Sequence, residues 1–231
     1  MTLRAAVLAS GRGTNFEVLA DHTAGREAPD WEVSLLLSDR EDAGALERAR
    51  VRTIPTAVVR VADRAPDEVA RETLAHLQGT RIDLVLLAGY LRLVPAPVVE
   101  AYRGRILNLH PALLPGFGGK GMYGLRVHRA VLEAGVRVSG ATVHIVDERY
   151  DRGPIVAQWP VPVLPGDTPE TLAERVTAVE HRLYPAAADA LVRALAAGTE
   201  PEPIPGEAAR HRPHFVASRR LPMPQPANEP S

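Results

Sequence analysis

One apolar run in the middle of the chain constrains the fold more than any other feature. Residues 82–88 read IDLVLLA, and the run stops at Gly89. A run of this kind is typical of a central parallel strand that is covered on both faces. Residues 3–9 (LRAAVLA) form a second such run, which ends at the glycine turn 10–13. Two buried strands of this type predict a parallel sheet with helices on both of its faces.

Patterns of strand and helix alternate along the rest of the chain. Pro55 favours an edge position or a late start for its strand, and Pro160 and Pro162 favour an edge for the last strand. Pro185 is expected to kink or interrupt the last helix. We therefore predict an α/β fold, doubly wound around a mostly parallel sheet. The other expected strands are 32–37, 53–59, 105–109, 136–146 and 155–163, and the expected helices are 16–24, 43–50, 66–77, 98–102, 127–134 and 168–197.

The composition changes after Gly198. Residues 199–231 contain 8 prolines and few aliphatic side chains. Such a segment cannot bury enough apolar surface to fold by itself. We expect one domain over residues 1–198 and a proline-rich, flexible C-terminal tail over 199–231.

Charge and residue content argue against several classes of protein. The formal net charge of −1 leaves no electrostatic footprint for nucleic acid or a membrane surface. There are no cysteines, which excludes disulfides and thiolate metal ligands. No segment approaches the roughly 20 apolar residues of a membrane span, and the N-terminus lacks the pattern of a signal peptide. The histidines show no metal-ligand spacing, and His76 and His128 are expected at the surface. We expect a cytoplasmic protein without a metal.

The end of the first strand offers a candidate anion site. Ligands of parallel sheets bind beyond the carboxyl ends of the strands. Residues 11–15 (GRGTN) connect the first strand to the first helix. Glycines let the backbone approach an anion, and the helix N-terminus presents free N–H groups to it. A phosphate monoester fits this segment, although a tight turn without a ligand is an alternative. A dinucleotide fingerprint would need glycine in place of Phe16.

A second group of polar residues follows the strand at 105–109. Asn108 and His110 are two residues apart, so both side chains point to the same face of the strand. An amide and an imidazole there can donate to a developing oxyanion, or they can simply cap a loop. Asp151 could favour the protonated form of His110 and accept a proton, or it could be a solvated turn acid. His144, within a strand, is either a structural residue or a possible supporting residue of the site.

Together these segments resemble the folate-dependent glycinamide ribonucleotide formyltransferases, over roughly residues 3–198. The resemblance implies a formyltransferase-like variant of the Rossmann fold. It also implies transfer of the formyl group of 10-formyltetrahydrofolate to the amine of 5′-phosphoribosylglycinamide, in purine biosynthesis. The stretches that carry it are VLASGRGTNF at 7–16, LLAGYLRLV at 86–94, ILNLHPALLP at 106–115, SGATVHIVDERYDRGPIVAQ at 139–158 and VEHRLYP at 179–185.

The resemblance also implies roles for individual residues. Asn108, His110 and Asp151 match the catalytic trio of the family. Arg152 stands where many relatives have a small residue, and the loop 116–124, which contains Lys120, is longer than in some relatives. The implied ribonucleotide-binding residues are Gly13, Thr14, Asn15, Phe16, Glu17 and Glu180. The implied folate-binding residues are Arg64, Leu91, Arg92, Leu93, Val94, Asn108, Asp147, Glu148, Arg149, Tyr150 and Asp151.

Three alternative functions use parts of the same pattern. Formyltetrahydrofolate deformylase applies the same trio to water, but its family has an extra domain before the catalytic one, and here the first strand begins at Leu3. Methionyl-tRNA formyltransferase has a C-terminal barrel, for which the tail 199–231 is too short. A non-catalytic nucleotide-binding module would leave Asn108, His110 and Asp151 without a role. We therefore expect a monomeric or homodimeric transferase that binds two small substrates, without nucleic acid or membrane.

Overall fold

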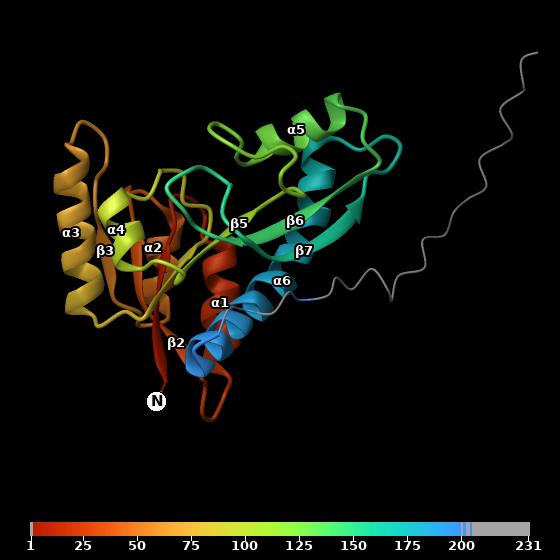
Figure 1. Cartoon of the computed structure of the whole chain (residues 1–231). Helices are drawn as coiled ribbons and strands as arrows, with labels where there is room; N and C mark the ends of the chain where they lie inside the picture. The colour runs from red at the N-terminus through yellow and green to blue at the C-terminus, as the bar shows by residue number, and fades with distance from the viewer. Residues whose placement is uncertain (1, 200, 202–203, 205–231) are drawn as a thin grey trace, which may run out of the picture.

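The computed structural model describes residues 2–199, 201 and 204. Its elements alternate along the chain from strand to helix, as Figure 1 shows. The strands are β1 (Leu3–Leu8), β2 (Trp31–Ser38), β3 (Thr56–Val58), β4 (Leu84–Leu87), β5 (Ile106–His110), β6 (Val138–Ile145) and β7 (Ile155–Pro162). The helices are α1 (Thr14–Ala24), α2 (Gly44–Val51), α3 (Pro66–Gly79), α4 (Ala96–Ala101), α5 (Leu125–Glu133) and α6 (Pro169–Ala197).

One seven-stranded sheet runs through the described part of the chain, in the order β3-β2-β1-β4-β5-β6-β7. The pairs from β3 to β5 are parallel, and β6 and β7 join antiparallel. The two apolar runs form β1 and β4, which are neighbours inside the sheet, as predicted. The prolines also marked the edges correctly, because β3 begins only after Pro55 and both β3 and β7 are edge strands.

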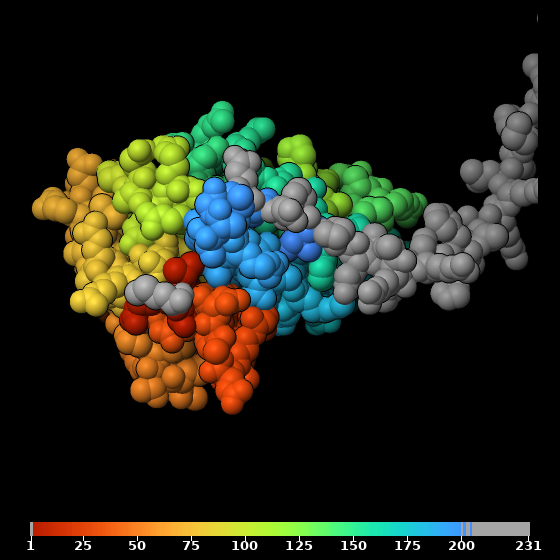
Figure 2. Space-filling model, turned by 60° about the horizontal axis from the view of Figure 1, so that its bottom comes forward, coloured from red at the N-terminus to blue at the C-terminus, as the bar shows by residue number. Residues whose placement is uncertain are grey.

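Helices cover both faces of the sheet, which confirms the predicted fold class. Alternation along β1 sends Ala5 and Val7 into a core shared with α1, α2 and α6. Ala6 and Leu8 point the opposite way, into a core shared with α3 and α4. Figure 2 shows the surface of α6 (blue) next to that of the N-terminal elements (red and orange), in agreement with the packing of α1 against α6.

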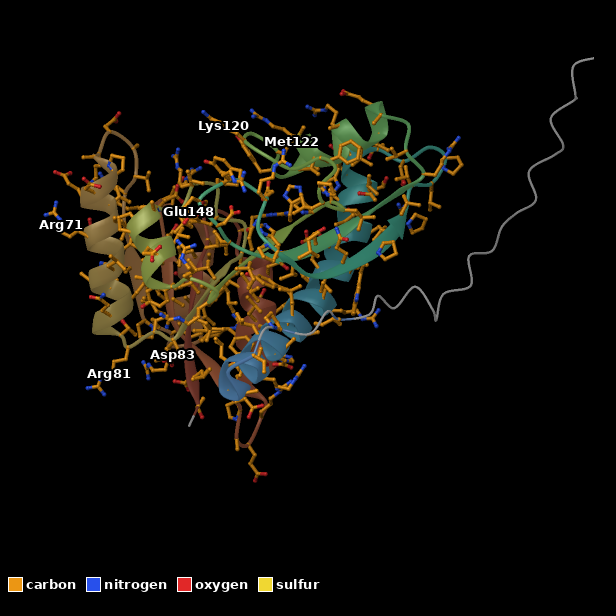
Figure 3. The ribbon with its side chains drawn as sticks, in the orientation of Figure 1. Arg71, Arg81, Asp83, Lys120, Met122 and Glu148 are labelled. Carbon is orange, nitrogen blue, oxygen red and sulfur yellow. The ribbon has the colours of Figure 1, made fainter. Side chains whose placement is uncertain are left out.

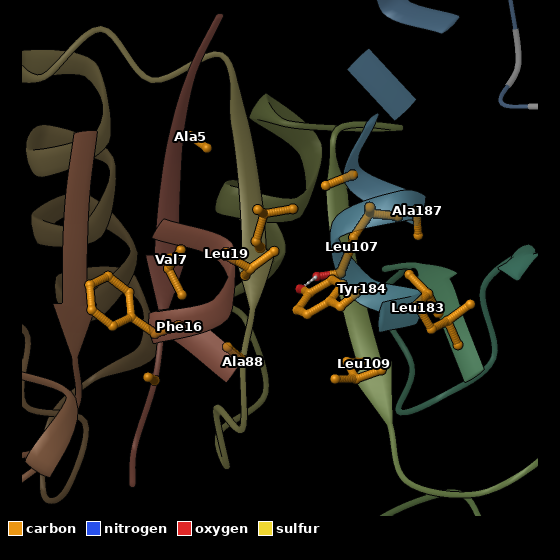
Figure 4. Close-up of a cluster of buried hydrophobic side chains, with 14 of the residues drawn as sticks. Ala5, Val7, Phe16, Leu19, Ala88, Leu107, Leu109, Leu183, Tyr184 and Ala187 are labelled. Carbon is orange, nitrogen blue, oxygen red and sulfur yellow. Dashed lines mark hydrogen bonds between the residues drawn. The ribbon is translucent and has the colours of Figure 1, made fainter. Parts of the chain in front are cut away.

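Helix α6 fixes one face of the sheet near the ends of its central strands. It continues through Pro185, so of the two effects predicted there, a kink or an interruption, the interruption does not occur. Both halves of the helix pack into one core, which holds it together despite the hydrogen bond that proline removes. The buried Tyr184 hydroxyl lies 3.0 Å from the carbonyl oxygen of Leu87 and 3.2 Å from that of Leu107 (Figure 4). These contacts fix α6 to the carboxyl end of β4 and to the first half of β5.

The end of α6 coincides with the predicted boundary of the domain. Gly198 is the C-cap residue, with φ of 65°. Beyond it, the Ile204 N–H donates to the Val156 carbonyl at 3.2 Å, and its side chain packs against the core. Almost all of the predicted tail 199–231 lies outside the described residues. No described helix has the length and apolar character that crossing a membrane requires.

Candidate active site

The carboxyl ends of β1, β4 and β5 open into one pocket of about 680 Å³. Residues 11–15 follow β1, residues 87–94 include the end of β4, and residues 108–111 include the end of β5. The loops around 119–126 and 146–151 complete its walls, together with one side of α6. The three strand ends singled out in the sequence therefore meet at a single site.

Four polar side chains converge at the bottom of this pocket. Asn108 and His144 are direct neighbours on the paired strands β5 and β6. The Asn108 Nδ2 atom lies 3.1 Å from His144 Nε2 and 3.3 Å from Asp151 Oδ1. Asp151 Oδ2 lies 3.6 Å from His110 Nδ1. The loop between β6 and β7 thus brings Asp151 to the two β5 residues with which it was predicted to act.

Asp151 is held in place from the opposite wall of the pocket. The Gly119 N–H donates to Asp151 Oδ2 at 2.7 Å. Burial opposes ionisation of Asp151, but its interactions with His144, Gly119 and His110 outweigh the effect of burial, so the pKa of Asp151 is lowered. The side chain is only 10% exposed, and it is a carboxylate at neutral pH. The alternative of a solvated turn acid is therefore excluded.

The pKa of His110 is shifted in the opposite direction to the one expected from the sequence, where Asp151 was expected to favour the protonated form. Its side chain is 4% exposed, and burial lowers the pKa of His110. Asp151 and a hydrogen bond to the Phe117 carbonyl act in the opposite direction without overcoming burial. The 2.8 Å contact between Nε2 and that carbonyl assigns the ring proton to Nε2. His110 is therefore neutral in the free chain at neutral pH.

His144 lies inside the site, consistent with the supporting position that the sequence suggested. Its Nδ1 atom is 2.8 Å from the Ile145 carbonyl oxygen, so Nδ1 donates and Nε2 is left to accept from Asn108. This contact defines which end of the Asn108 amide faces His144 and Asp151. His144 therefore orients the amide of Asn108.

His128 was predicted at the surface, and that prediction is wrong. The residue is 4% exposed and lines the pocket from α5. Within the described residues its Nδ1 has no hydrogen-bond partner. Burial, and secondarily His110, lower the pKa of His128 to about 4. The helical spacing of Val127, His128 and Val131, which share the buried face of α5, is the signal that could have identified it.

The buried histidines predict that the fold loses stability in acid. Because the pKa of His128 is lower in the folded chain than its usual 6.5, the unfolded chain binds more protons as the pH falls. The free energy of unfolding should therefore decrease between pH 6.5 and about 4. Urea unfolding at several pH values should show a shallower decrease in His128→Gln than in the parent chain. Identical slopes would show that His128 is not buried in its neutral form.

The segment predicted to bind phosphate reaches the pocket with its first residues. Gly13 is the N-cap of α1 with φ of 80°, and Thr14 and Asn15 line the pocket. A Cβ atom at position 13 would lie 2.6 Å from Ala45, so glycine is required there on both counts. The first N–H groups of α1 have no partner within the helix, so they can donate hydrogen bonds to a bound anion.

The next two residues of this segment do not reach the pocket with their side chains. Phe16 is completely buried in the core. Glu17 forms ion pairs with Arg48 and Arg52 of α2. Its N–H donates to the Gly13 carbonyl at 3.0 Å, so it is not free for a ligand. At Phe16 only the backbone N–H is left for the ribonucleotide role that the resemblance assigned.

Glu180 is placed beside this segment by α6. Its Oε2 atom accepts a hydrogen bond from Asn15 Nδ2 at 3.0 Å. Burial raises the pKa of Glu180, and the Asn15 contact only partly offsets this. Asn15 Oδ1 is also buried, without a partner in the described part of the chain. These polar groups face the pocket next to the N-terminus of α1.

Most of the residues expected to bind folate line the other half of the pocket. The segment 91–94 follows β4, and the Leu91 N–H donates to Ser10 Oγ at 3.0 Å. Asp147, Arg149 and Tyr150 line the wall formed by the β6–β7 loop.

Two of the expected folate residues lie outside the pocket. Arg64 forms ion pairs with Glu68 and Glu72 of α3, so its guanidinium is engaged elsewhere. Glu148 pairs with Arg103 at 2.7 Å and is not among the residues that line the pocket. Neither residue lines the pocket in this structure, because both charges are paired away from it.

Several residues with no expected role also line the pocket. Lys120 belongs to the 116–124 loop, which also carries Met122 (Figure 3). Arg152, beside Asp151, is exposed. The described residues contain no cluster of His, Asp or Glu that could hold a metal ion. Other lining residues that were not singled out include Tyr123, Leu125, Arg126, Ala173 and Thr177.

Comparison with known proteins agrees with this geometry. Residues 3–188 match the family model described as formyl transferase. The chain is 48% identical over 181 residues to the chloroplastic phosphoribosylglycinamide formyltransferase of Arabidopsis thaliana, covering 78% of this chain and 62% of that protein. It is 38% identical over 185 residues to phosphoribosylglycinamide formyltransferase of Bacillus subtilis (strain 168), covering 78% of this chain and 90% of that protein.

A solved structure extends the similarity to three dimensions. Glycinamide ribonucleotide transformylase 1 from Symbiobacterium toebii has a TM-score of 0.77 and 42% identity, covering 83% of this chain and 88% of that chain. The chain spans only about three fifths of the length of the plant relatives. Its match with the bacterial relatives is close to full length on their side. The chain therefore belongs to the formyl transferase family and, within it, to the phosphoribosylglycinamide formyltransferases.

Proposed function

We propose that this chain transfers the formyl group of 10-formyltetrahydrofolate to the amine of 5′-phosphoribosylglycinamide. One observation carries the proposal: an anion-binding helix N-terminus and the group of Asn108, His110 and Asp151 open into the same pocket. The products are formylglycinamide ribonucleotide and tetrahydrofolate. Membership of the family supports the assignment of both substrates.

The ribonucleotide occupies the half of the pocket next to α1. Its phosphate binds the free N–H groups of Thr14, Asn15 and Phe16, where the helix dipole favours negative charge. Glu180 and Asn15 face the same space and offer polar atoms to the rest of the ribonucleotide. The amine is thereby directed toward the ends of β4 and β5.

The folate occupies the half formed by residues 91–94 and 147–151. Backbone atoms of the segment after β4 line this half together with Tyr150. Arg64 and Glu148 do not line this half, because each is paired outside the pocket. The formyl group lies between the two substrates, next to Asn108.

The reaction begins when the neutral amine attacks the formyl carbon. A C–N bond forms, and the carbonyl electron pair moves onto the formyl oxygen. The Asn108 amide donates to this oxyanion. The Nε2 proton of His110 is bound to the Phe117 carbonyl in the free chain, so His110 donates to the oxyanion only after its ring takes up a second proton. The new negative charge next to His110 opposes the effect of burial, so His110 gains affinity for a proton as the oxyanion forms.

Asp151 completes the transfer as a proton acceptor. The attacking nitrogen becomes positively charged and must lose a proton before the intermediate collapses. Asp151 is ionised and lies beside Asn108 and His110, so it takes this proton directly or through a water. Collapse then breaks the bond to the folate nitrogen, which takes up the proton that Asp151 received from the amine and leaves as tetrahydrofolate.

The phosphate site predicts that the acceptor must carry its phosphate. Glycinamide riboside, which lacks it, should react far more slowly than the ribonucleotide at equal concentration. Thr14→Ala should raise the KM for the ribonucleotide only modestly, because backbone N–H groups supply most of the binding. Initial rates measured by the absorbance change of formyl loss, with either acceptor, test both expectations.

Controls separate this site from the folate site. Inorganic phosphate should compete with the ribonucleotide and leave folate binding unchanged. Gly13→Val should abolish ribonucleotide binding, but it also clashes with Ala45, so its folded fraction must be measured alongside. Equal rates with riboside and ribonucleotide would contradict the assignment of the α1 N-terminus.

Three further expectations are part of the proposal. We infer a cytoplasmic location, a monomeric or homodimeric state, and a reaction that needs no metal. Gel filtration with light scattering measures the oligomeric state. Activity after dialysis against a chelator tests whether a metal is needed, and the chain is expected to keep its full activity.

A further inference from the structure

We propose that Asp39 is a positioning residue that holds the Arg92 guanidinium ready for a carboxylate of the folate co-substrate. The inference rests on the proposed function, because it assigns the ligand of Arg92. Asp39 directly follows β2, and its side chain is 1% exposed. Its Oδ2 atom accepts a hydrogen bond from Arg92 Nε at 2.9 Å, and the Arg92 side chain is 47% exposed.

The burial of Asp39 is not explained by stability. A buried charge costs free energy even when it is paired, and an apolar replacement of such a pair is often neutral or stabilising. Asp39 Oδ1 is buried as well, and no group in the described part of the chain donates to it. A carboxyl group placed in this way is better explained by what it does to Arg92.

Arg92 keeps two hydrogen-bond donors that Asp39 does not use. An arginine has donors at Nε and at both Nη atoms, and Asp39 uses only Nε. No hydrogen bond from another described residue reaches the two Nη atoms of Arg92. Arg92 lines the pocket between Leu91 and Leu93, which are 42% and 44% exposed. Two Nη donors at a pocket wall match a carboxylate, which binds guanidinium groups in a bidentate manner.

The backbone that precedes Arg92 is also fixed by hydrogen bonds. Residues 88–95 form no helix or strand. The Leu91 N–H donates to Ser10 Oγ, and the Ser10 N–H donates to the Gly89 carbonyl at 3.1 Å. Ser10 follows β1 as Asp39 follows β2, so two strand ends fix this segment. The folate carries carboxylates on its glutamate, and they are the groups of that substrate that fit a fixed guanidinium.

The test compares two folate ligands that differ only in this group. 5-Formyltetrahydrofolate carries the glutamate, and 5-formyltetrahydropteroate lacks it. Their dissociation constants should be measured by calorimetry on the full chain, for the parent, Asp39→Asn, Arg92→Gln and the double variant. Asp167→Asn is the matched control, because Asp167 is a buried carboxylate paired with Arg175 at 2.8 Å outside the pocket.

We expect the parent to prefer the ligand with glutamate. Asp39→Asn and Arg92→Gln should each reduce this preference by about tenfold, the effect of one charged hydrogen bond. The double variant should lose no more than either single variant, and Asp167→Asn should keep the parent's preference. An unchanged preference in Asp39→Asn or Arg92→Gln overturns the proposal. Equal weakening of both ligands in Asp39→Asn also overturns it, because it shows a purely structural role.

The readout separates this proposal from the proposed function. The binding measurement needs no ribonucleotide and no turnover. A parent chain that binds folate through Arg92 but forms no formylated product leaves the Asp39 proposal intact and contradicts the proposed reaction. A parent chain that binds neither 5-formyltetrahydrofolate nor 5-formyltetrahydropteroate overturns both the Asp39 proposal and the proposed reaction.

Discussion

Replacing Asn108 or His110 by alanine should each lower kcat by at least about 10²-fold, because each removes a donor to the oxyanion. Both side chains act on charge that exists mainly in the transition state, so KM values should change much less. Asn108 is expected to show the purer effect, since its amide is already oriented by His144. Steady-state rates with both substrates saturating give the comparison.

Asn108→Asp provides the sharper version of this test. It keeps the size of the side chain but replaces the amide donor with an acceptor next to Asp151. Turnover should fall as far as in Asn108→Ala, whereas folate and ribonucleotide should still bind. Near-normal turnover in any of these variants would remove Asn108 or His110 from the mechanism.

Asp151→Asn should be at least as damaging, with a loss of about 10²- to 10⁴-fold in kcat from the missing proton acceptor. The parent's rate should fall in acid as Asp151 is protonated, at a pH below the usual range of the group because the pKa of Asp151 is lowered. The Asp151→Asn variant should be much less active, and its remaining rate should no longer show this fall in acid. Rates measured across pH for both proteins show whether the limb belongs to Asp151.

Asp189→Asn is the matched control for this variant. Asp189 is also a carboxylate with a lowered pKa, and it pairs with His22 at 3.1 Å outside the pocket. Its replacement should affect stability more than turnover. If Asp151→Asn kept the parent's pH–rate profile in height and shape, Asp151 would have no role in proton transfer.

The fold could be predicted because its main signals are local. Continuous apolar runs identified β1 and β4, and prolines identified both edge strands. Pro185 does not interrupt α6, because tertiary packing holds the helix on both sides of the proline, and a local rule does not include such packing.

The candidate site was predictable to the level of segments. The end of each central strand pointed to the pocket, and the spacing of Asn108 and His110 placed both on one face. A matching segment does not reveal which of its side chains face a ligand, however. The turn of α1 directs Phe16 into the core, and neighbouring charges draw Glu17 and Glu148 away from the pocket.

Burial by distant elements could not be read from the sequence. His110 is neutral because β5, β6 and the loop 116–124 enclose it together, and that enclosure exceeds the effect of Asp151. His128 is buried on the inner face of α5, and the same burial lowers its pKa. Both protonation states depend on contacts between segments that are far apart along the chain.

The most direct measurement follows the formyl group itself. 10-Formyltetrahydrofolate labelled with ¹³C at the formyl carbon should be incubated with the chain and 5′-phosphoribosylglycinamide, and the products followed by NMR. The proposed reaction places the label on the amine of the ribonucleotide, with no loss of formyl when the ribonucleotide is omitted. Label appearing as formate, with or without the ribonucleotide, would show a hydrolase and contradict the account.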